Sequence, residues 1–464
     1  MGDVAPALAA ASTMTVAPPA VVRTAGLPSS LSVADADTGA AGDAAPAAAT
    51  AADVVGSAAD SAPKATAGKS RRYINLTGFP FPLGPFVERP TVATTIVPGK
   101  VYSFEQEQAL SGITANVRSV VFRMRDNHLL VYNPVAPTDE FLSQLDSLNS
   151  KGVSHILLGA TAYEHKIFVG PFARKFPTAK VWAVPGQWSF PVNLDEKLLG
   201  IDPRGSGGGD LIDTAKGSKA YANAADLTDE FEVKLLKPSR RLGFGYAANE
   251  AAILHKDTKT LAITDALVNV PAKPPPIYDR ANLIEIGDNA NGNTLGSLIL
   301  NGAGAVNWRG TAAAEVKALY ADADARKGGE DATVQRGWER NTLLSLYFGP
   351  SPASLIDPHE SFEGLKNKWI VAPVTDSLIY RSSKVKPELT RWVNDVAQWD
   401  FTTIAPAHFQ AAPGTPTELK AAFDPTLAAP GGVVPSPDQR APYAAGDVKL
   451  LDDIAEQLIK LKVI

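Results

Sequence analysis

The sequence predicts an α/β fold made of layered helices and strands, and three observations support this prediction. Apolar runs of strand length alternate with helical periodicity between residues 120 and 184. Two more apolar runs flank a short polar turn at residues 256–259. Polar side chains follow the ends of three predicted strands, which is typical of the functional edge of a layered α/β fold.

The elements of the first half follow from local spacing and turn residues. A hairpin over residues 120–132 is expected to turn at Asp126–Asn127. An amphipathic helix follows, with Thr138 as its N-cap and Gly152 as its stop. The next elements form a βαβ unit, with a strand over 154–158, a helix over 167–176 and a strand over 181–184.

The second half is expected to add strands first and helices later. Residues 230–239 restart strand structure, and a hairpin of two apolar strands follows around the turn 256–259. The proline-rich residues 271–279 predict an irregular loop. The remaining predicted elements are helices within 281–331, a helix over 387–398, a strand over 401–405, a Pro/Gly-rich linker over 426–447 and a C-terminal helix over 448–464.

Residues 1–72 differ in composition from the rest of the chain. They are rich in Ala, Ser, Thr and Pro and contain no aromatic residue before Tyr73. Such a segment buries too little apolar surface to offset its chain entropy, so it is expected to be disordered. The same bias predicts an organelle transit peptide, and the alternative is a low-complexity tail without a targeting role.

The overall composition excludes several classes of function. The chain has 464 residues and no cysteine, so disulfides, thiolate metal sites and thiol nucleophiles are excluded. Its net charge of −5 argues against a nucleic-acid partner, which requires a basic face. No run of 18 uncharged apolar residues is present, so no transmembrane segment is predicted.

Three predicted strands end close to metal-ligating residue types. Strand 154–158 leads to His165, strand 261–264 leads directly to Asp265, and strand 401–405 leads to His408. Because strand ends at one sheet edge share a crevice, we expect these three side chains to form a mononuclear metal site. Two imidazoles and a carboxylate suit one zinc or iron ion.

Each of these residues also has a simpler structural explanation. His165 could start a helix, Asp265 could cap the turn after its strand, and His408 could be a buried histidine bonded to backbone. Three further residues are catalytic candidates, with a surface charge or ordinary packing as their alternative roles. They are Glu164 and Glu250 as proton-transferring groups and Tyr246 as a hydrogen-bond donor to a bound oxyanion.

The segments TKTLAITDAL (258–267) and IAPAH (404–408) resemble the metallo-β-lactamase-like superfamily. That resemblance implies a four-layer αββα sandwich with its metal at one edge of two sheets. Longer segments resemble the plant, algal and cyanobacterial family of unknown function DUF4336, over roughly residues 77–409. They are TGFPFPLGPFVERPTV (77–92), FEQEQAL (104–110), AYEHKIFVGPFARKFPTAKVWAVPGQWSFPVNL (162–194), TDALVNVP (264–271), QRGWERNTLLSLYFGPS (335–351) and IAPAHF (404–409). The resemblance implies a metallo-β-lactamase-like domain over residues 73–425 and a chloroplast location, in the stroma or at the thylakoid.

The chain departs from the superfamily's metal motif, His-x-His-x-Asp-His. Its two leading histidines fall on Ala160 and Ala162, its Asp on Glu164 and its last His on His165. The downstream metal histidine falls on Tyr246. A two-metal site, which needs ligands for both ions, is therefore not supported.

Two functions are consistent with these residues. The first is a mononuclear metal-dependent hydrolase that activates water at the sheet edge, with a small molecule as its unknown substrate. The same ligands would also permit iron-dependent redox chemistry. The second is a metal-free, catalytically inactive scaffold that acts as a protein-binding or assembly factor.

Overall fold

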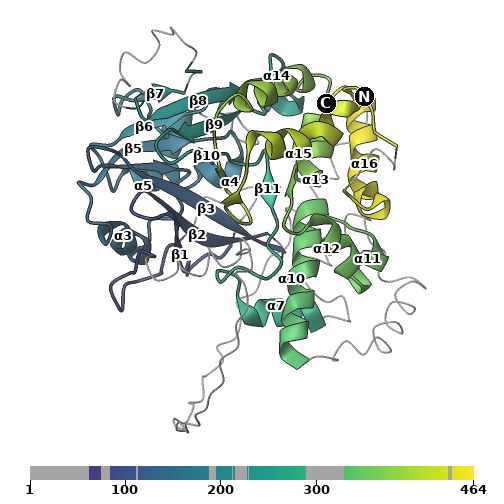
Figure 1. Ribbon diagram of the computed structural model, residues 1–464, viewed down its shortest axis with the longest axis horizontal. Coiled ribbons are helices and arrows are strands. Elements are labelled where there is room, and N and C mark those ends of the chain that lie inside the picture. The colour runs from purple at the N-terminus through teal and green to yellow at the C-terminus, as the bar shows by residue number, and fades with distance from the viewer. Residues whose placement is uncertain are drawn as a thin grey trace, which may run out of the picture. The chain divides into compact units, whose positions relative to one another are not determined.

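Two β-sheets pack face to face, and helices cover their outer faces (Figure 1). The computed structural model describes residues 62–74, 84–110, 113–187, 195–211, 213–214, 227, 229–288, 329–436 and 442–464. All of these residues belong to one compact unit, Ala58–Ile464.

The first sheet has seven strands that follow one another in chain order. They are β1 (Val92–Val97), β2 (Val101–Leu110), β3 (Ile113–Arg123), β4 (Leu129–Tyr132), β5 (Val153–Leu158), β6 (Lys180–Ala183) and β7 (Gly209–Asp210). Strands β1 to β4 pair antiparallel, and β4 to β7 pair parallel. The β3–β4 pair confirms the predicted hairpin, and the parallel β5–β6 pair confirms the predicted βαβ unit.

The second sheet has five strands in the order β14-β13-β10-β9-β8. They are β8 (Phe231–Leu236), β9 (Glu250–His255), β10 (Thr260–Ala262), β13 (Thr403–Ala405) and β14 (Ala412–Pro413). Antiparallel pairing of β9 with β10 confirms the second predicted hairpin. Parallel pairing of β10 with β13 brings together two distant parts of the chain, so both strands end at the same edge of the sheet.

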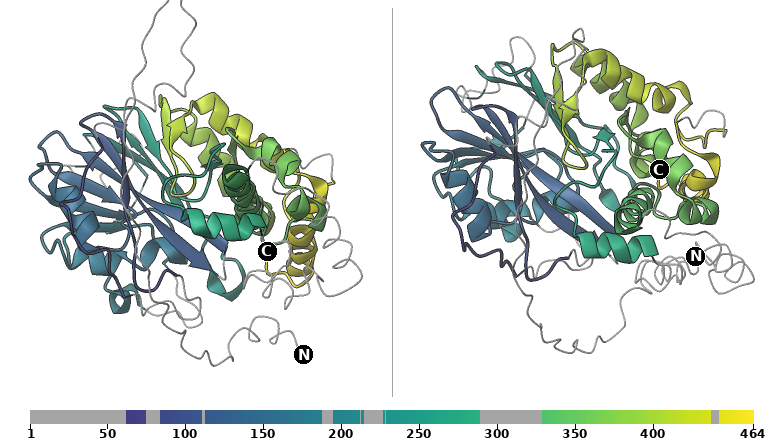
Figure 2. Two further views of the ribbon diagram at one scale, coloured as in Figure 1. Left: turned by 90° about the horizontal axis from the view of Figure 1, so that it is seen from below. Right: turned by 60° about the horizontal axis from the view of Figure 1, so that its bottom comes forward.

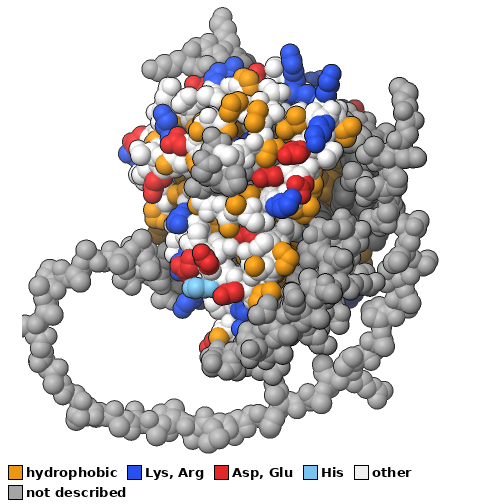
Figure 3. Space-filling model, turned by 90° about the vertical axis from the view of Figure 1, so that its right-hand side faces the viewer, with side chains coloured by type: hydrophobic (Ala, Val, Ile, Leu, Met, Phe, Trp, Pro, Cys, Tyr) orange, Lys and Arg blue, Asp and Glu red, His pale blue; other side chains and the backbone are white. Residues whose placement is uncertain are grey.

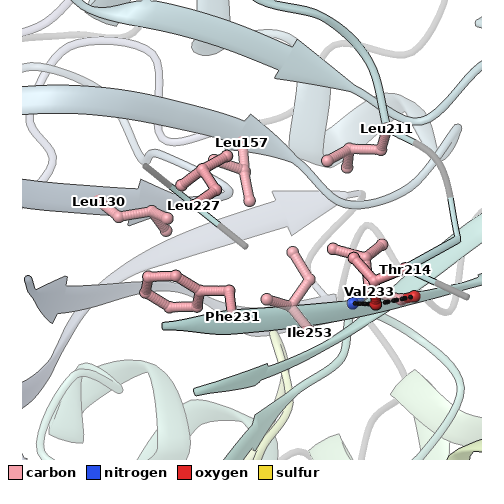
Figure 4. Close-up of a pocket in the computed structure, with 8 residues that line it drawn as sticks. All are labelled: Leu130, Leu157, Leu211, Thr214, Leu227, Phe231, Val233 and Ile253. Atoms are coloured by element: carbon pink, nitrogen blue, oxygen red, sulfur yellow. Dashed lines mark hydrogen bonds between the residues drawn. The ribbon is translucent and has the colours of Figure 1, made fainter. Parts of the chain in front are cut away.

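The core between the sheets follows from the two-residue period of the strands. On β3, Val120 and Phe122 pack against the second sheet, whereas Val121 packs on the outer face. Figure 4 shows Leu130 and Leu157 of the first sheet facing side chains of the second. The cavity at this point is apolar and only about 10 Å³ in volume, so the interior between the sheets is filled by side chains.

Helices form the two outer layers (Figure 2). Helices α3 (Asp139–Asp146) and α5 (Val169–Ala173) pack on the first sheet, and α14 (Lys386–Val396) and α15 (Pro416–Ala428) pack on the second. Helix α3 begins as predicted, because the Thr138 side chain accepts a hydrogen bond from the backbone N–H of Phe141. The layer order confirms the predicted αββα sandwich.

The helix predicted over residues 167–176 is shorter in the structure. Helix α5 covers only the middle of that range, and a separate short helix, α4 (Tyr163–Lys166), precedes it. Pro171, in the first turn of α5, has no backbone N–H to donate to Ile167, so α4 and α5 do not form one continuous helix. Residue 165 consequently lies inside the first short helix, close to the end of β5.

A further helical group extends the molecule beside the sheets. Its elements are α7 (Arg280–Asp288), α10 (Gly329–Tyr347), α11 (Pro352–Ile356), α12 (His359–Leu365), α13 (Pro373–Thr375), α16 (Ala445–Lys460) and the strand pair β11 (Val268–Asn269) and β12 (Trp369–Ile370). They enclose a separate apolar cluster around Trp338. Asn341 on α10 bonds to Thr114 on β3, which ties this group to the first sheet.

Two of the predicted segment boundaries differ from where the described elements begin or end. Residues 62–74 include Arg71, which forms an ion pair with Glu140 on α3, so ordered structure begins before residue 73. Residues 1–61 lie outside the described residues, and the transit peptide stays a prediction. Helix α15 continues to Ala428, past the predicted linker start at 426, and ends where Pro430 disfavours a helical residue before it.

Among the described residues, no helix combines the length and apolarity needed to cross a membrane.

Figure 3 shows the face that carries α11, α12 and α16, where charges of both signs are interspersed. On α16, Lys449 pairs with Asp453 and Lys460 pairs with Glu456, both at a spacing of four residues. This spacing places the partners on the same side of the helix. Such a mixed face has no single-sign field.

Replacing Gly159 with Ala is expected to destabilise the contact between the sheets. A Cβ at this position would lie 2.1 Å from the Tyr132 hydroxyl oxygen, which bonds to Ala251 on β9 and to Thr264 just after β10. Overpacking of this kind costs about 1–3 kcal/mol, so the urea midpoint should fall. Gly209→Ala is the control, because its Cβ meets no atom closer than 3.9 Å. Equal midpoints for the two variants would contradict the prediction.

Candidate metal centre

The loops that follow β5, β10 and β13 meet at one edge of the sandwich. Asp265 and His408 lie near each other because β10 and β13 are parallel neighbours. The β5 loop joins them through backbone bonds to the start of β9. Ala251 donates to the Gly159 carbonyl over 2.8 Å, and Thr161 donates to the Asn249 carbonyl over 3.1 Å. These backbone bonds between residues 159–161 and 249–251, here called the β5–β9 seam, place His165 at the same edge.

The two predicted histidine ligands both face one oxygen atom of the third predicted ligand, Asp265. Oδ1 of Asp265 lies 3.1 Å from Nε2 of His165 and 3.2 Å from Nε2 of His408. The two imidazole rings have centroids 5.1 Å apart. Glu164 adds a carboxylate oxygen, and all four ligand atoms lie within 4.8 Å of one another. The structure therefore brings together His165, Asp265, His408 and Glu164.

A hydrogen bond to the backbone fixes the tautomer of His408. Its Nδ1 lies 2.8 Å from the carbonyl oxygen of Asn116, which can only accept, so Nδ1 carries a proton and donates. In a neutral imidazole, Nε2 then presents its lone pair, and this atom faces the carboxylate of Asp265. Two electron-rich atoms at this distance require a cation, either a proton on Nε2 or a metal ion between them.

The pKa shifts of Asp265 and His408 have opposite directions. Burial raises the pKa of the Asp265 carboxyl, but the charges and hydrogen bonds of His165 and His408 outweigh burial and hold this pKa well below its usual range. Burial lowers the pKa of His408, but its hydrogen bond to Asp265 outweighs that effect and leaves the pKa raised. Asp265 is therefore an ionised carboxylate that attracts positive charge to this point.

Glu250, predicted as a possible proton-transferring group, lies behind Asp265. Its Oε1 accepts hydrogen bonds from the backbone N–H groups of Thr264, Asp265 and Ala266, at 2.7, 3.1 and 3.2 Å. The side chain is buried, and burial together with the negative charge of Asp265 raises the pKa of Glu250 to about 8. Glu250 thus holds the loop that presents Asp265.

The turn that presents His408 is held by a buried polar group that the sequence reasoning missed. Arg118 on β3 forms an ion pair with Glu105, its cross-strand neighbour on β2, at 2.8 Å. Arg118 also donates to the carbonyl oxygens of Pro406 and Phe409. Asn116, two residues from Arg118 and therefore on the same face of the strand, exchanges two hydrogen bonds with the backbone of residue 409.

The other predicted site residues take different positions. Like Asp265 and His408, Glu164 is half-buried. Tyr246 lies near it, and burial raises the pKa of its phenol well above the ordinary value, with Glu164 and Asp265 adding to the rise. The backbone of Ala160 forms an antiparallel β-bridge with Glu250. The position at which the superfamily motif has a histidine is therefore part of the β5–β9 seam.

The donor set fits a zinc or iron ion. Two imidazole nitrogens and a carboxylate oxygen lie close enough to share one ion at bond lengths of about 2.0–2.2 Å. The second ring nitrogen of His408 donates to a carbonyl, as is usual for metal-bound histidine. Nδ1 of His165 is buried and has no hydrogen-bond partner among the described residues, so packing and Asp265 orient this ring.

Replacing Arg118 with Met is expected to destabilise the protein strongly. The change leaves Glu105 charged, buried and without its guanidinium partner, and it frees the carbonyl groups of the turn at residues 406–409. Breaking one side of a buried pair costs about 3–5 kcal/mol, which denaturant unfolding would detect. Lys449→Ala, which removes an exposed ion pair on α16, is the control and should change the midpoint little. A similar small change for Arg118→Met would refute this role.

No curated protein matches the chain. Several solved structures are similar to it. The metal-soaked Flv1 flavodiiron core from Synechocystis sp. PCC6803 shows 11% identity and a TM-score of 0.36 over 73% of this chain and 61% of that one. The metallo-beta-lactamase from Pontibacter korlensis shows 13% identity and a TM-score of 0.27 over 43% of this chain and 83% of that one. The flavodiiron protein from Giardia intestinalis shows 10% identity and a TM-score of 0.35 over 74% of this chain and 60% of that one. The chain thus spans less than two thirds of either flavodiiron structure.

The family comparison covers most of the globular part. The family described as "Domain of unknown function (DUF4336)" matches residues 98–424. This range includes every predicted metal ligand and all strands of both central sheets except β1, which ends at Val97. It confirms the predicted family, and the chain belongs to the DUF4336 family.

Proposed function

We propose that the protein is a hydrolase that holds one zinc or iron ion between His165, His408 and Asp265. One observation carries the proposal: nitrogen atoms of two imidazoles face the same carboxylate oxygen, at 3.1 and 3.2 Å. The tautomer of His408 leaves a lone pair directed at that oxygen. A metal ion satisfies all three ligand atoms at once.

The exposure of the ligands indicates where a substrate would enter. The side chain of His165 is 0% exposed, whereas those of Asp265 and His408 are 23% and 20% exposed. The site is therefore closed at the ring of His165 and open to solvent past the other two ligands. When bound, the metal would act as a Lewis acid and lower the pKa of a coordinated water.

The chain's own residues would position the metal ligands and move the proton. Asn116 holds the ring of His408 through its backbone carbonyl. Glu250 holds the Asp265 loop, and three backbone N–H groups already occupy its accepting oxygen. Glu164, which lies in the ligand cluster and reaches solvent, is therefore the better candidate for the proton acceptor.

A metal-free scaffold is the alternative function, and the same geometry supports it. A proton on Nε2 of His408 would also resolve the contact with Asp265, and the raised pKa of His408 favours that form. The centre would then be a buried ion pair that stabilises the sheet edge. Such a protein would act through its surface, as a binding or assembly factor.

Metal analysis separates the two functions. We expect the full-length chain, stripped with EDTA and reloaded with zinc, to retain one more metal ion per chain than its His408→Ala variant. Asp265→Asn should lose the same ion, because it removes the ligand oxygen that both rings face. His359→Ala is the matched control, since His359 is exposed and lies on α12.

One result would contradict the proposal. Equal metal content in wild type, His408→Ala and Asp265→Asn, with circular dichroism showing that all three are folded, would exclude the metal centre. The scaffold would then be the better account of this family member.

A further inference from the structure

A second group of metal-ligating side chains lies at the opposite end of β9 from Glu250. It consists of Glu230, just before β8, His255, the last residue of β9, and Asp257, in the turn between β9 and β10. One ligand atom from each lies within 4.8 Å of the others. Glu230 and His255 are buried, while the Asp257 side chain is 31% exposed, so solvent reaches the group.

His255 presents an unpartnered ring nitrogen to this group. The ring is fully buried and packs against Phe122 and Phe231, at centroid distances of 5.3 and 4.9 Å. Its Nδ1 lies 2.7 Å from the hydroxyl of Thr258, which itself donates to Thr260, so Nδ1–H is the donor. Nε2 therefore carries a lone pair and has no hydrogen-bond partner among the described residues.

That lone pair points toward a carboxylate. Nε2 of His255 lies 3.9 Å from Oε2 of Glu230, too far for a hydrogen bond and suited to two bonds to a shared ion. Burial lowers the pKa of His255 to about 4. As with His408 and Asp265 at the other edge, an imidazole Nε2 lies near a carboxylate oxygen, but here at 3.9 Å and not 3.2 Å.

The local charges also favour a cation. Asp126 and Asp229 lie near Glu230 and Asp257 and add negative charge. Arg125 and Lys100 are the positive groups nearby: the Arg125 guanidinium pairs with Asp257, its backbone N–H donates to both oxygens of Glu230, and the charge of Lys100 lowers the pKa of His255. Arg125 therefore compensates part of the acidic charge and would compete with a bound metal.

From these observations we infer that His255, Glu230 and Asp257 form a second binding site for a divalent transition-metal ion such as zinc. One nitrogen and two carboxylate oxygens suit zinc, with solvent as a fourth ligand. The ion would join the start of β8 to the turn between β9 and β10, while the backbone N–H of Arg125 links Glu230 to the β3–β4 turn. Its role is structural: it would hold this end of the second sheet together, opposite the candidate metal centre.

The inference is tested with full-length protein and zinc alone. After EDTA treatment, equilibrium dialysis against zinc should give one more ion per chain for wild type than for Asp257→Asn. The affinity of the Asp257→Asn variant for this ion should be lower than that of wild type by about tenfold or more, as is typical when a metal site is disturbed. Zinc should also raise the melting temperature of wild type more than that of the variant. Asp126→Asn, which removes an equal charge outside the ligand group, should weaken zinc binding far less than Asp257→Asn.

Two further variants keep the test decisive. His255→Gln should lose the same ion, with circular dichroism as the check on folding. Arg125→Gln should bind zinc more tightly, by roughly threefold to tenfold, because a competing positive charge is removed. Equal zinc binding by wild type, Asp257→Asn and His255→Gln would overturn the inference. Since His408→Ala removes a different ion, failure here leaves the proposed function intact, and the reverse also holds.

Discussion

The buried ion pair between Arg118 and Glu105 is the interaction on which the candidate metal centre depends. Both side chains lie on the inner face of the first sheet, yet Arg118 donates to backbone carbonyls that follow β13 of the second sheet. The pair thus fixes the turn that carries His408. Buried charges are retained only when their hydrogen bonds are satisfied, and the carbonyls of this turn supply those bonds.

The β5–β9 seam provides the second constraint. Backbone bonds between residues 159–161 and 249–251 align the end of the first sheet with the start of β9. Glu250 begins that strand and holds the loop of Asp265, while Ala160 uses its backbone to close the seam. The two histidines therefore reach one carboxylate from different sheets. This explains how a centre can form although two histidines of the superfamily motif are replaced by alanine.

Much of the fold could be predicted from the sequence, because strands and helices have local signatures. Apolar runs located β5, β9 and β10, and the polar residues after them pointed to His165, Asp265 and His408. The supporting residues had no such signature. Asn116 bonds to a backbone group 293 residues away, and the partners of Glu250 are backbone N–H groups, which no residue pattern reveals. His255 also has no such signature, since its orientation toward Glu230 depends on packing between two phenylalanine rings.

X-ray absorption at the zinc edge tests the central claim most directly. The zinc-loaded Asp257→Asn protein is the suitable sample, because only the candidate metal centre should hold zinc in it. The account predicts nitrogen and oxygen ligands at about 2.0–2.2 Å, outer-shell scattering from two imidazole rings and no sulfur. A shell of oxygen alone, or an unchanged spectrum after His408→Ala is added, would contradict a metal held by His165, Asp265 and His408.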